Sequence, residues 1–245
     1  MSKDKSKSKG KARAKAQDKL INQDQGQGKK QDSDKDRLHL DTFSIGIAVS
    51  KFNSDITDNL LVGAERVFGE GLEECVQQWW EGLVKRPELE LMYMTDELRD
   101  SISSRYKSAN INLKITRVPG SFELPLGVQW LAQDKVVGVV ALGAIIQGET
   151  SHHDHLAEAV SQGLMRVSLN HRIPLGFGLI TANNYEQAQE RADIDAFKSA
   201  AAAKRSAKGG KSNKGYEAAS AVLEMLLERD FSYKLRELAR NAPAK

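Results

Sequence analysis

The strongest constraint on the fold is an alternation between short apolar runs and segments with helical spacing. Four runs have the length and the β-branched content of buried strands; they cover residues 43–49, 113–118, 136–146 and 175–182. The run VVGVVALGAII at 136–146 has no polar side chain, which is typical of a strand covered on both faces. Strands that alternate with helices predict an α/β domain with a mostly parallel, doubly wound sheet.

An amphipathic helix is predicted after each strand. The first predicted helix begins near Thr57. The other three cover residues 122–130, 156–167 and 216–230. In the second of them, Phe122, Leu126 and Trp130 recur at every fourth position. The same periodicity places Leu156 and Val160 on one face of the third helix. These helices supply the two outer layers of the predicted domain.

Two segments are not part of this alternation of strands and helices. Residues 76–112 form a long insertion ahead of the second strand, and residues 193–212 are predicted as an exposed loop or a loose helix. Trp79 and Trp80, in the first insertion, could mark a partner surface, but buried packing is the favoured interpretation.

Composition limits the class of protein. The sequence has no apolar run of roughly 18 residues, the length a membrane helix requires. The N-terminus lacks the apolar core of a secretory signal. Cys75 is the single cysteine, so it can form neither an internal disulfide nor a cysteine metal cage. We therefore expect a cytoplasmic protein.

Residues 1–37 differ in composition from the rest of the chain. They carry 12 Lys or Arg and 6 Asp residues, a local net charge of +6 in a chain whose total is +3. With almost no apolar residues, they are predicted to be a disordered basic tail. Two interpretations remain open: an arm that binds nucleic acid or another polyanion, and a solubilising tail without a specific partner. We expect the domain itself to cover residues 38–230, followed by a C-terminal extension at 231–245.

Polar and glycine-bearing loops follow all four predicted strands. These loops are KFNSD (51–55), VPGSFE (118–123), IIQGETSHH (145–153) and TANN (181–184). In parallel α/β sheets, ligands bind in the crevice beyond the carboxyl ends of the strands. The pattern therefore predicts a binding crevice at this edge of the sheet, although loops of α/β proteins are commonly polar without binding anything.

Three of the five histidines gather in the stretch GETSHHDH, residues 148–155. Ser151 is predicted as the N-cap of the third helix, with Asp154 three residues later as in a capping box. His152 and His153 then lie in the first turn, where unpaired backbone N–H groups and the helix dipole favour an anion such as phosphate. The same field disfavours an imidazolium, so a histidine here is expected to be neutral and able to accept a proton.

A metal site is the competing interpretation of these histidines. His152 and His155 are three residues apart and could share a ligand face beside Asp154. Zinc sites bring further ligands from elsewhere, and His39 and His171 are the histidines that remain. Proton transfer is therefore favoured, and no metal is predicted.

Five stretches carry a family resemblance. They are KFNSDITDNLLVGA (51–64), VPGSFELPL (118–126), ALGAIIQGETSHHDHLAEAV (141–160), GFGLITANNYEQAQERA (176–192) and NKGYEAASAVLEM (213–225). In this order they resemble the motifs of the lumazine synthase family. The resemblance implies a flavodoxin-like three-layer α/β/α sandwich around a four-stranded parallel sheet. It also implies a homo-oligomer, either a pentamer or a shell of 60 subunits.

The resemblance implies a transferase of the penultimate step of riboflavin biosynthesis, without a metal or an organic cofactor. Such enzymes condense 5-amino-6-(D-ribitylamino)uracil with 3,4-dihydroxy-2-butanone 4-phosphate to 6,7-dimethyl-8-ribityllumazine, and release phosphate and water. His152 matches the catalytic histidine. The residues that match substrate-binding positions are Phe52, Ser121, Phe122, Glu123, Ala144, Ile145, Ile146, Glu149 and Thr150, together with Phe177 and Arg191 from the neighbouring subunit.

The chain departs from the family pattern at several positions. Gln147 stands where a basic residue is common, and His153 and His155 stand where aromatic residues are frequent; we expect packing and surface roles for these two histidines. The insertion at 193–212 follows Arg191 directly and could displace it or Lys214. Two alternative functions remain: a shell or scaffold protein with reduced catalysis and a polyanion-binding tail, and an enzyme of the same fold with a related substrate, such as a riboflavin synthase.

Overall fold

The structure is a computed structural model that describes residues 42–86, 95–107, 110–196 and 212–241. All of them belong to a unit that spans Asp41–Lys245. The predictions for the basic tail at 1–37 lie outside the described residues, as do the central part of the 193–212 insertion and part of the 76–112 insertion.

A four-stranded parallel sheet forms the centre of this unit. Its strands are β1 (Thr42–Ser50), β2 (Asn110–Val118), β3 (Gly138–Ile146) and β4 (Leu175–Ala182). They lie in the order β2-β1-β3-β4, and every neighbouring pair is parallel. Residues 138–145 of β3 are all buried, which explains the apolar run in that strand. The predicted strands and the parallel sheet are confirmed.

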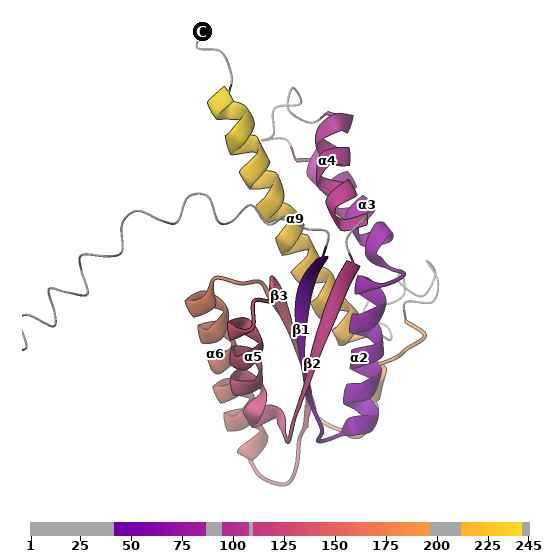
Figure 1. Cartoon of the computed structure of the whole chain (residues 1–245). Helices are drawn as coiled ribbons and strands as arrows, with labels where there is room; N and C mark the ends of the chain where they lie inside the picture. The colour runs from indigo at the N-terminus through magenta and orange to yellow at the C-terminus, as the bar shows by residue number, and fades with distance from the viewer. Residues whose placement is uncertain (1–41, 87–94, 108–109, 197–211, 242–245) are drawn as a thin grey trace, which may run out of the picture. The chain divides into compact units, whose positions relative to one another are not determined.

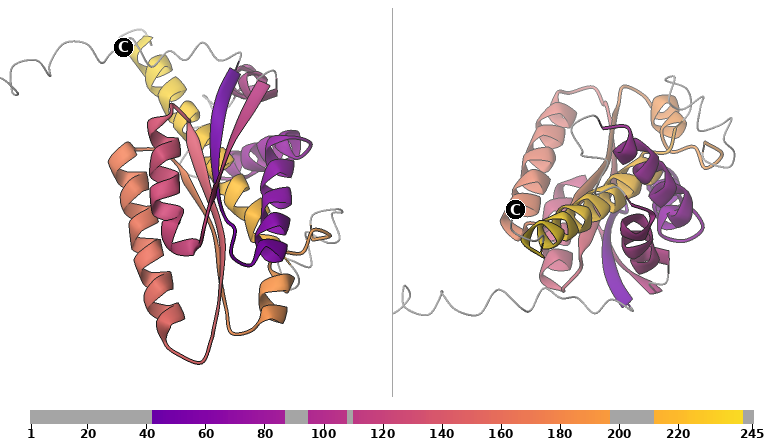
Figure 2. Two further views of the ribbon diagram at one scale, coloured as in Figure 1. Left: turned by 60° about the horizontal axis from the view of Figure 1, so that its bottom comes forward. Right: turned by 90° about the horizontal axis from the view of Figure 1, so that it is seen from above.

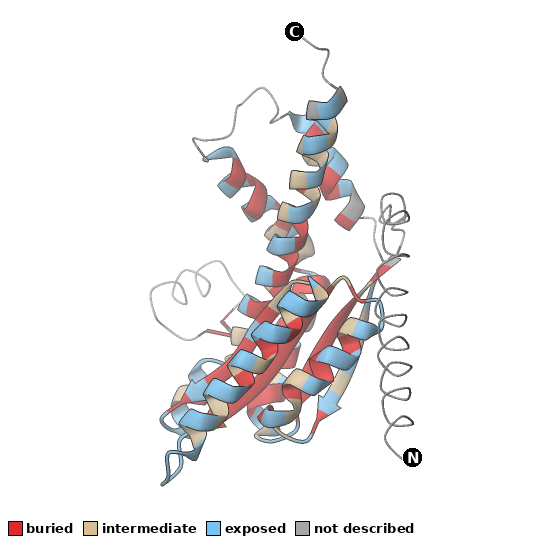
Figure 3. Cartoon of the chain, turned by 90° about the vertical axis from the view of Figure 1, so that its left-hand side faces the viewer, coloured by how far each residue is buried: buried red, intermediate tan, exposed pale blue. Residues whose placement is uncertain are grey.

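Helices cover both faces of the sheet and complete the predicted α/β/α sandwich (Figures 1 and 2). The helices on one face are α5 (Leu124–Gln133) and α6 (His152–His171), and those on the other are α2 (Ser54–Phe68) and α9 (Lys214–Asn241). The short α7 (Tyr185–Glu190) follows β4. In Figure 3 the strands are mostly buried, whereas the helices alternate between buried and exposed positions. None of the described helices combines the length and the apolarity of a membrane span.

Helix α5 shows that an apolar stripe in the sequence need not face the core. The sequence predicted this helix from Phe122, Leu126 and Trp130, but their side chains are 64%, 50% and 55% exposed. Leu124 and Val128, completely buried, face the sheet instead. The helix has apolar residues around most of its circumference, so periodicity predicted the helix but could not select the buried side.

Two further helices, α3 (Leu72–Val84) and α4 (Asp96–Lys107), occupy much of the region from 72 to 107. Trp79 and Trp80 in α3 are buried, which confirms the packing interpretation. The Trp79 ring meets Phe231 of α9 edge to face at 6.0 Å. The Tyr106 hydroxyl of α4 donates a hydrogen bond to Asp230 of α9 at 2.7 Å. Helix α9 also runs without a break through residues 231–241, the described part of the expected C-terminal extension.

Helices α2 and α9 approach so closely at one point that the residue of α9 there has no room for a side chain. A Cβ atom at the buried Gly215 would overlap the backbone carbonyl of Leu60 in α2. We expect Gly215→Ala to lower the free energy of unfolding by about 2–3 kcal/mol, because a backbone atom cannot move aside as a side chain can. Urea unfolding measures the change.

The matched control for this substitution is Gly82→Ala. Gly82 is an exposed glycine of α3, and no atom lies within 4 Å of the point where a Cβ atom would stand. Alanine there should leave stability unchanged or raise it by about 0.5–1 kcal/mol through helix propensity. Equal losses at Gly215 and Gly82 would show that the close approach of α2 and α9 is unimportant.

Candidate active site

A cavity of about 620 Å³ opens at the carboxyl ends of β1, β2 and β3, beside the start of α6. This volume is typical of sites for small molecules. The residues that line it are Phe52, Gly120, Ser121, Phe122, Glu123, Ala144, Ile145, Ile146, Gly148, Thr150, His152, His153 and Leu156. Three of the four predicted loops therefore meet at the predicted edge of the sheet. The fourth, residues 181–184, does not line the cavity.

The loop after β1 places Phe52 at the cavity. Its ring is 68% exposed, whereas the backbone around it is fixed by neighbouring side chains. Thr57 donates from its hydroxyl to the Ser50 carbonyl at 2.7 Å, and Asn53 donates from Nδ2 to the Ala144 carbonyl at 3.0 Å. Asn53 thus joins the loop to the end of β3.

Asn53 is a site residue that the sequence analysis did not single out. Its φ angle is 57°, in the left-handed region that asparagine tolerates better than most residues. An asparagine immediately before a helix is a signal for such a turn, but the hydrogen-bond partner is 91 positions away in the sequence.

The loop after β2 forms a short 3-10 turn, Ser121–Glu123, before α5. Glu123 accepts a hydrogen bond on Oε2 from the Gly120 backbone N–H at 2.9 Å, so its carboxylate holds the loop that it belongs to. Ser121 is buried and Phe122 is exposed. All three residues of the turn line the cavity, as the sequence predicted.

The start of α6 differs in detail from the prediction. Ser151 is the N-cap residue, but its side chain makes no capping hydrogen bond, so the predicted capping box is wrong. The nearby bonds involve Thr150 instead: its hydroxyl accepts from the His152 backbone N–H at 3.4 Å, and its carbonyl oxygen lies 3.0 Å from His153 Nδ1.

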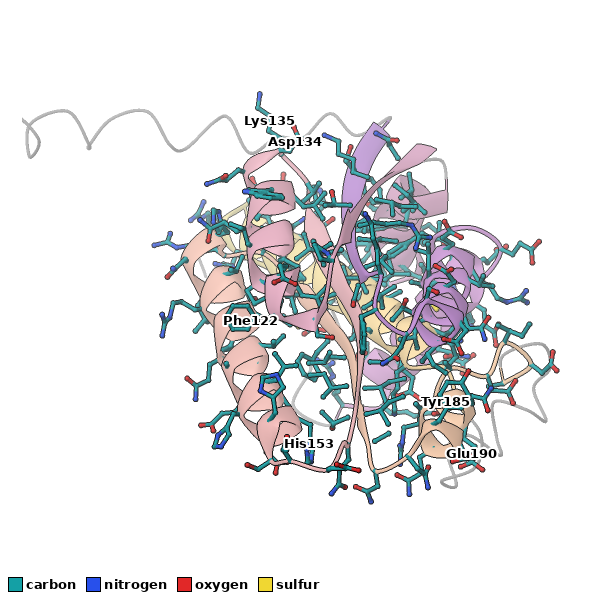
Figure 4. The ribbon with its side chains drawn as sticks, turned by 90° about the horizontal axis from the view of Figure 1, so that it is seen from below. Phe122, Asp134, Lys135, His153, Tyr185 and Glu190 are labelled. Carbon is teal, nitrogen blue, oxygen red and sulfur yellow. The ribbon has the colours of Figure 1, made fainter. Side chains whose placement is uncertain are left out.

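His152 and His153 both line the cavity, whereas His155 does not. Figure 4 places His153 near the start of α6, on the same side of the sheet as Phe122. His153, for which a packing or surface role is expected, lines the cavity with a side chain that is largely buried. Helical rotation separates His155 from its neighbours and directs it to solvent.

Three predicted site residues lie outside the cavity lining. Glu149 is exposed in the turn between Gly148 and Thr150. Phe177, on the edge strand β4, is 49% exposed, and Arg191 is exposed directly after α7. Figure 4 shows α7, marked by Tyr185 and Glu190, across the sheet from Phe122 and His153. One copy of the chain therefore does not bring Phe177 and Arg191 to the cavity of the same copy.

The 193–212 insertion leaves and rejoins the domain at one place. Ala192 and Asn213 form an antiparallel bridge. The Lys214 N–H donates to the Arg191 carbonyl at 2.8 Å, and the Asp193 N–H donates to the Ser212 carbonyl at 3.0 Å. The backbone on each side of the insertion is thus tied together, with Arg191 and Lys214 hydrogen-bonded to each other at its base.

The ionisable side chains in the cavity lining are those of Glu123, His152 and His153. No group of three or more His, Cys, Asp or Glu residues suited to a metal ion occurs among the residues that the structure describes. Burial raises the pKa of the Cys75 thiol, whose Sγ lies 3.8 Å from the Tyr216 hydroxyl. Burial also raises the pKa of Tyr216, and neither group lines the cavity.

The chain is similar to known proteins over most of the described domain. The family model for 6,7-dimethyl-8-ribityllumazine synthase matches residues 92–229. A protein of that name from Blochmanniella pennsylvanica is 35% identical over 183 residues, which cover 74% of this chain and 85% of the relative.

Shorter alignments have higher identity. The 6,7-dimethyl-8-ribityllumazine synthases of Renibacterium salmoninarum and Nitratidesulfovibrio vulgaris are each 46% identical over 114 residues, or 46% of this chain. These alignments span 67% and 64% of the two relatives. The resemblance of the sequence motifs is thereby confirmed. The chain belongs to the 6,7-dimethyl-8-ribityllumazine synthase family, which comprises transferase-type enzymes of riboflavin biosynthesis.

Proposed function

We propose that the cavity condenses 5-amino-6-(D-ribitylamino)uracil with 3,4-dihydroxy-2-butanone 4-phosphate to 6,7-dimethyl-8-ribityllumazine, with release of phosphate and water. The observation that supports this reaction best is the joint placement of Phe52, Glu123 and His152 around one cavity. They offer a flat ring, a hydrogen-bond acceptor and a proton carrier to two substrates held side by side. Much of the rate enhancement then comes from positioning, because the amine and the ketone react readily once they are aligned.

The pyrimidine substrate binds at the Phe52 side of the cavity in this proposal. The exposed Phe52 ring provides a face for stacking. The backbone at Ala144–Ile146 provides hydrogen-bonding groups for the edge of the uracil ring. The Glu123 carboxylate has enough lone pairs to hold Gly120 and also to accept a ribityl hydroxyl. Ser121 and Phe122 complete this side.

The phosphate-bearing substrate binds at the turn that begins α6. Backbone N–H groups at a helix N-terminus attract anions, and Glu149 and Thr150 belong to the turn that would enclose the phosphate. His152 lies in the first turn of that helix and lines the cavity. As a neutral imidazole it can move protons while the imine forms and phosphate leaves.

A neighbouring copy of the chain completes the site in this proposal. Phe177 and Arg191 are exposed and lie outside the lining of the cavity of their own copy, so a second copy can present them. The Arg191 guanidinium would then bind the phosphate by charge-assisted hydrogen bonds. This arrangement requires a homo-oligomer, a pentamer or a 60-subunit shell, and we place the enzyme in the cytoplasm.

The reaction is tested with the purified full-length chain and the two substrates. We expect the absorbance of the lumazine to rise together with an equal amount of inorganic phosphate. Failure of a folded, oligomeric protein to form product would refute the enzyme proposal and favour the scaffold alternative. Formation of riboflavin from lumazine alone would favour the related-substrate alternative.

The shared site predicts complementation between two inactive variants. Oligomers of His152→Ala subunits lack the proton carrier, and those of Arg191→Ala subunits lack the phosphate partner. When the two variants assemble together in equal amounts, a site is intact where an Arg191→Ala subunit supplies His152 and the adjacent His152→Ala subunit supplies Arg191. Random mixing places these two subunits in that order at about one quarter of all sites. Steady-state rates of co-refolded mixtures measure the recovery.

The control mixes His152→Ala subunits with subunits that carry both substitutions. No combination of these copies contains an intact site, so activity should not exceed that of the His152→Ala variant. If the first mixture gained no activity over its components although mixed oligomers had formed, Arg191 would not act across a subunit boundary.

A further inference from the structure

The cavity contains a second imidazole, His153, whose contacts differ from those expected of a catalytic group. Its side chain is 19% exposed, although it lies at the beginning of a surface helix. Its Nδ1 atom is 3.0 Å from the Thr150 carbonyl oxygen. A carbonyl oxygen can only accept a hydrogen bond, so Nδ1 carries the proton and donates it. This nitrogen is therefore occupied by the backbone of the turn that precedes α6.

The turn has few other side-chain supports. Gly148 has open space around the position of a Cβ atom, and Glu149 is exposed. Ser151 supplies no side-chain cap. The hydrogen bond from His153 thus reaches back from the first turn of α6 and holds the carbonyl of Thr150. This bond caps no backbone N–H group of the helix; it ties the first turn of α6 to the carbonyl that precedes it.

Fixing this carbonyl also fixes a backbone donor. The Thr150 carbonyl and the Ser151 N–H belong to one planar peptide group, in which they point in opposite directions. When His153 holds the carbonyl, it sets the direction of the N–H at the very start of the helix. Backbone N–H groups at this position are the ones that bind anions.

We propose that His153 is a positioning residue for the phosphate group of the second substrate. It acts through the Thr150–Ser151 peptide and does not transfer protons itself. The proposal rests on the proposed function, because it assigns the phosphate to the turn before α6. It implies that His153 controls the affinity for the phosphate-bearing substrate and leaves the pyrimidine side of the cavity unaffected.

A neighbouring carboxylate faces the other ring nitrogen, and it attracts the ring only when that nitrogen also carries a proton. His153 Nε2 lies 3.2 Å from Asp154 Oδ1, on the side of the ring away from Nδ1. The Asp154 side chain is 73% exposed, so solvent weakens this contact. The bond to Thr150 is therefore the one that the experiment should remove.

The test compares three full-length variants with the wild-type oligomer. His153→Phe keeps a flat ring but loses the donor, His153→Asn keeps an amide donor near the position of Nδ1, and His155→Phe changes an exposed ring outside the cavity. Each is assayed for kcat and for the KM of both substrates. The dissociation constant of inorganic phosphate, measured by calorimetry, gives a reading that does not require turnover.

We expect His153→Phe to raise the KM of the butanone phosphate and the dissociation constant of phosphate by about threefold to tenfold, the effect of one lost hydrogen bond. The KM of the pyrimidine and kcat should remain unchanged. His153→Asn should recover most of the phosphate affinity, and His155→Phe should match the wild type.

Two results would overturn the proposal: unchanged phosphate affinity in His153→Phe, or equal increases in the KM of both substrates. An asparagine variant no better than the phenylalanine variant would also contradict it. These failures are distinct from failure of the proposed function, which is seen as a wild-type protein that forms no lumazine. The calorimetric measurement still decides the role of His153 in that case.

Discussion

His152→Ala is expected to lower kcat by about a hundredfold, at the low end of the effect of general acid–base catalysis. The loss is not larger because the cavity still aligns the amine with the ketone after the imidazole has gone. The KM of each substrate should change little, since His152 acts on protons that move during the reaction. Initial rates of lumazine formation with both substrates at saturation measure the effect on kcat.

The control for this prediction is His155→Ala. His155 lies three residues further along α6, is exposed and does not line the cavity. Its removal should leave kcat as in the wild type. A His152→Ala enzyme with wild-type kcat would assign the whole rate enhancement to substrate alignment and leave the chain without an identified proton carrier.

Phe231→Ala is expected to reduce the free energy of unfolding by about 3–5 kcal/mol. The Phe231 side chain is only 2% exposed and packs edge to face against Trp79. Truncation removes this contact and leaves a cavity between α3 and α9 that the surrounding helices fill only in part. Urea unfolding gives the total change, and hydrogen exchange shows whether the α3 amides lose protection first.

Tyr233→Ala provides the comparison on the same helix. Tyr233 is another aromatic residue of α9, but it is 60% exposed. Its loss should change stability by less than about 0.5 kcal/mol. Equal destabilisation by the two substitutions would mean that the contact between α3 and α9 contributes nothing to the free energy of unfolding beyond the contribution of α9 alone. The activity of folded Phe231→Ala should be normal, because Phe231 does not line the cavity.

The sequence determined the central architecture because the relevant signals are local. A strand covered on both faces must be apolar throughout, and β3 is. An amphipathic helix buries one stripe, and of the two residues predicted on that stripe of α6, Val160 is buried and Leu156 is partly buried. Loops at the carboxyl ends of parallel strands must share one edge, so most of the cavity lining could be predicted from the order of the elements.

Tertiary structure alone decided which side of α5 faces the sheet and that α9 continues to Asn241. It also decided the roles of Asn53 and His153. Asn53 binds a carbonyl on another strand, and His153 lines the cavity while its Nδ1 contacts the Thr150 carbonyl. These features depend on which residues meet after the chain has folded. Sequence periodicity describes one element at a time, so it cannot specify contacts that two elements make together.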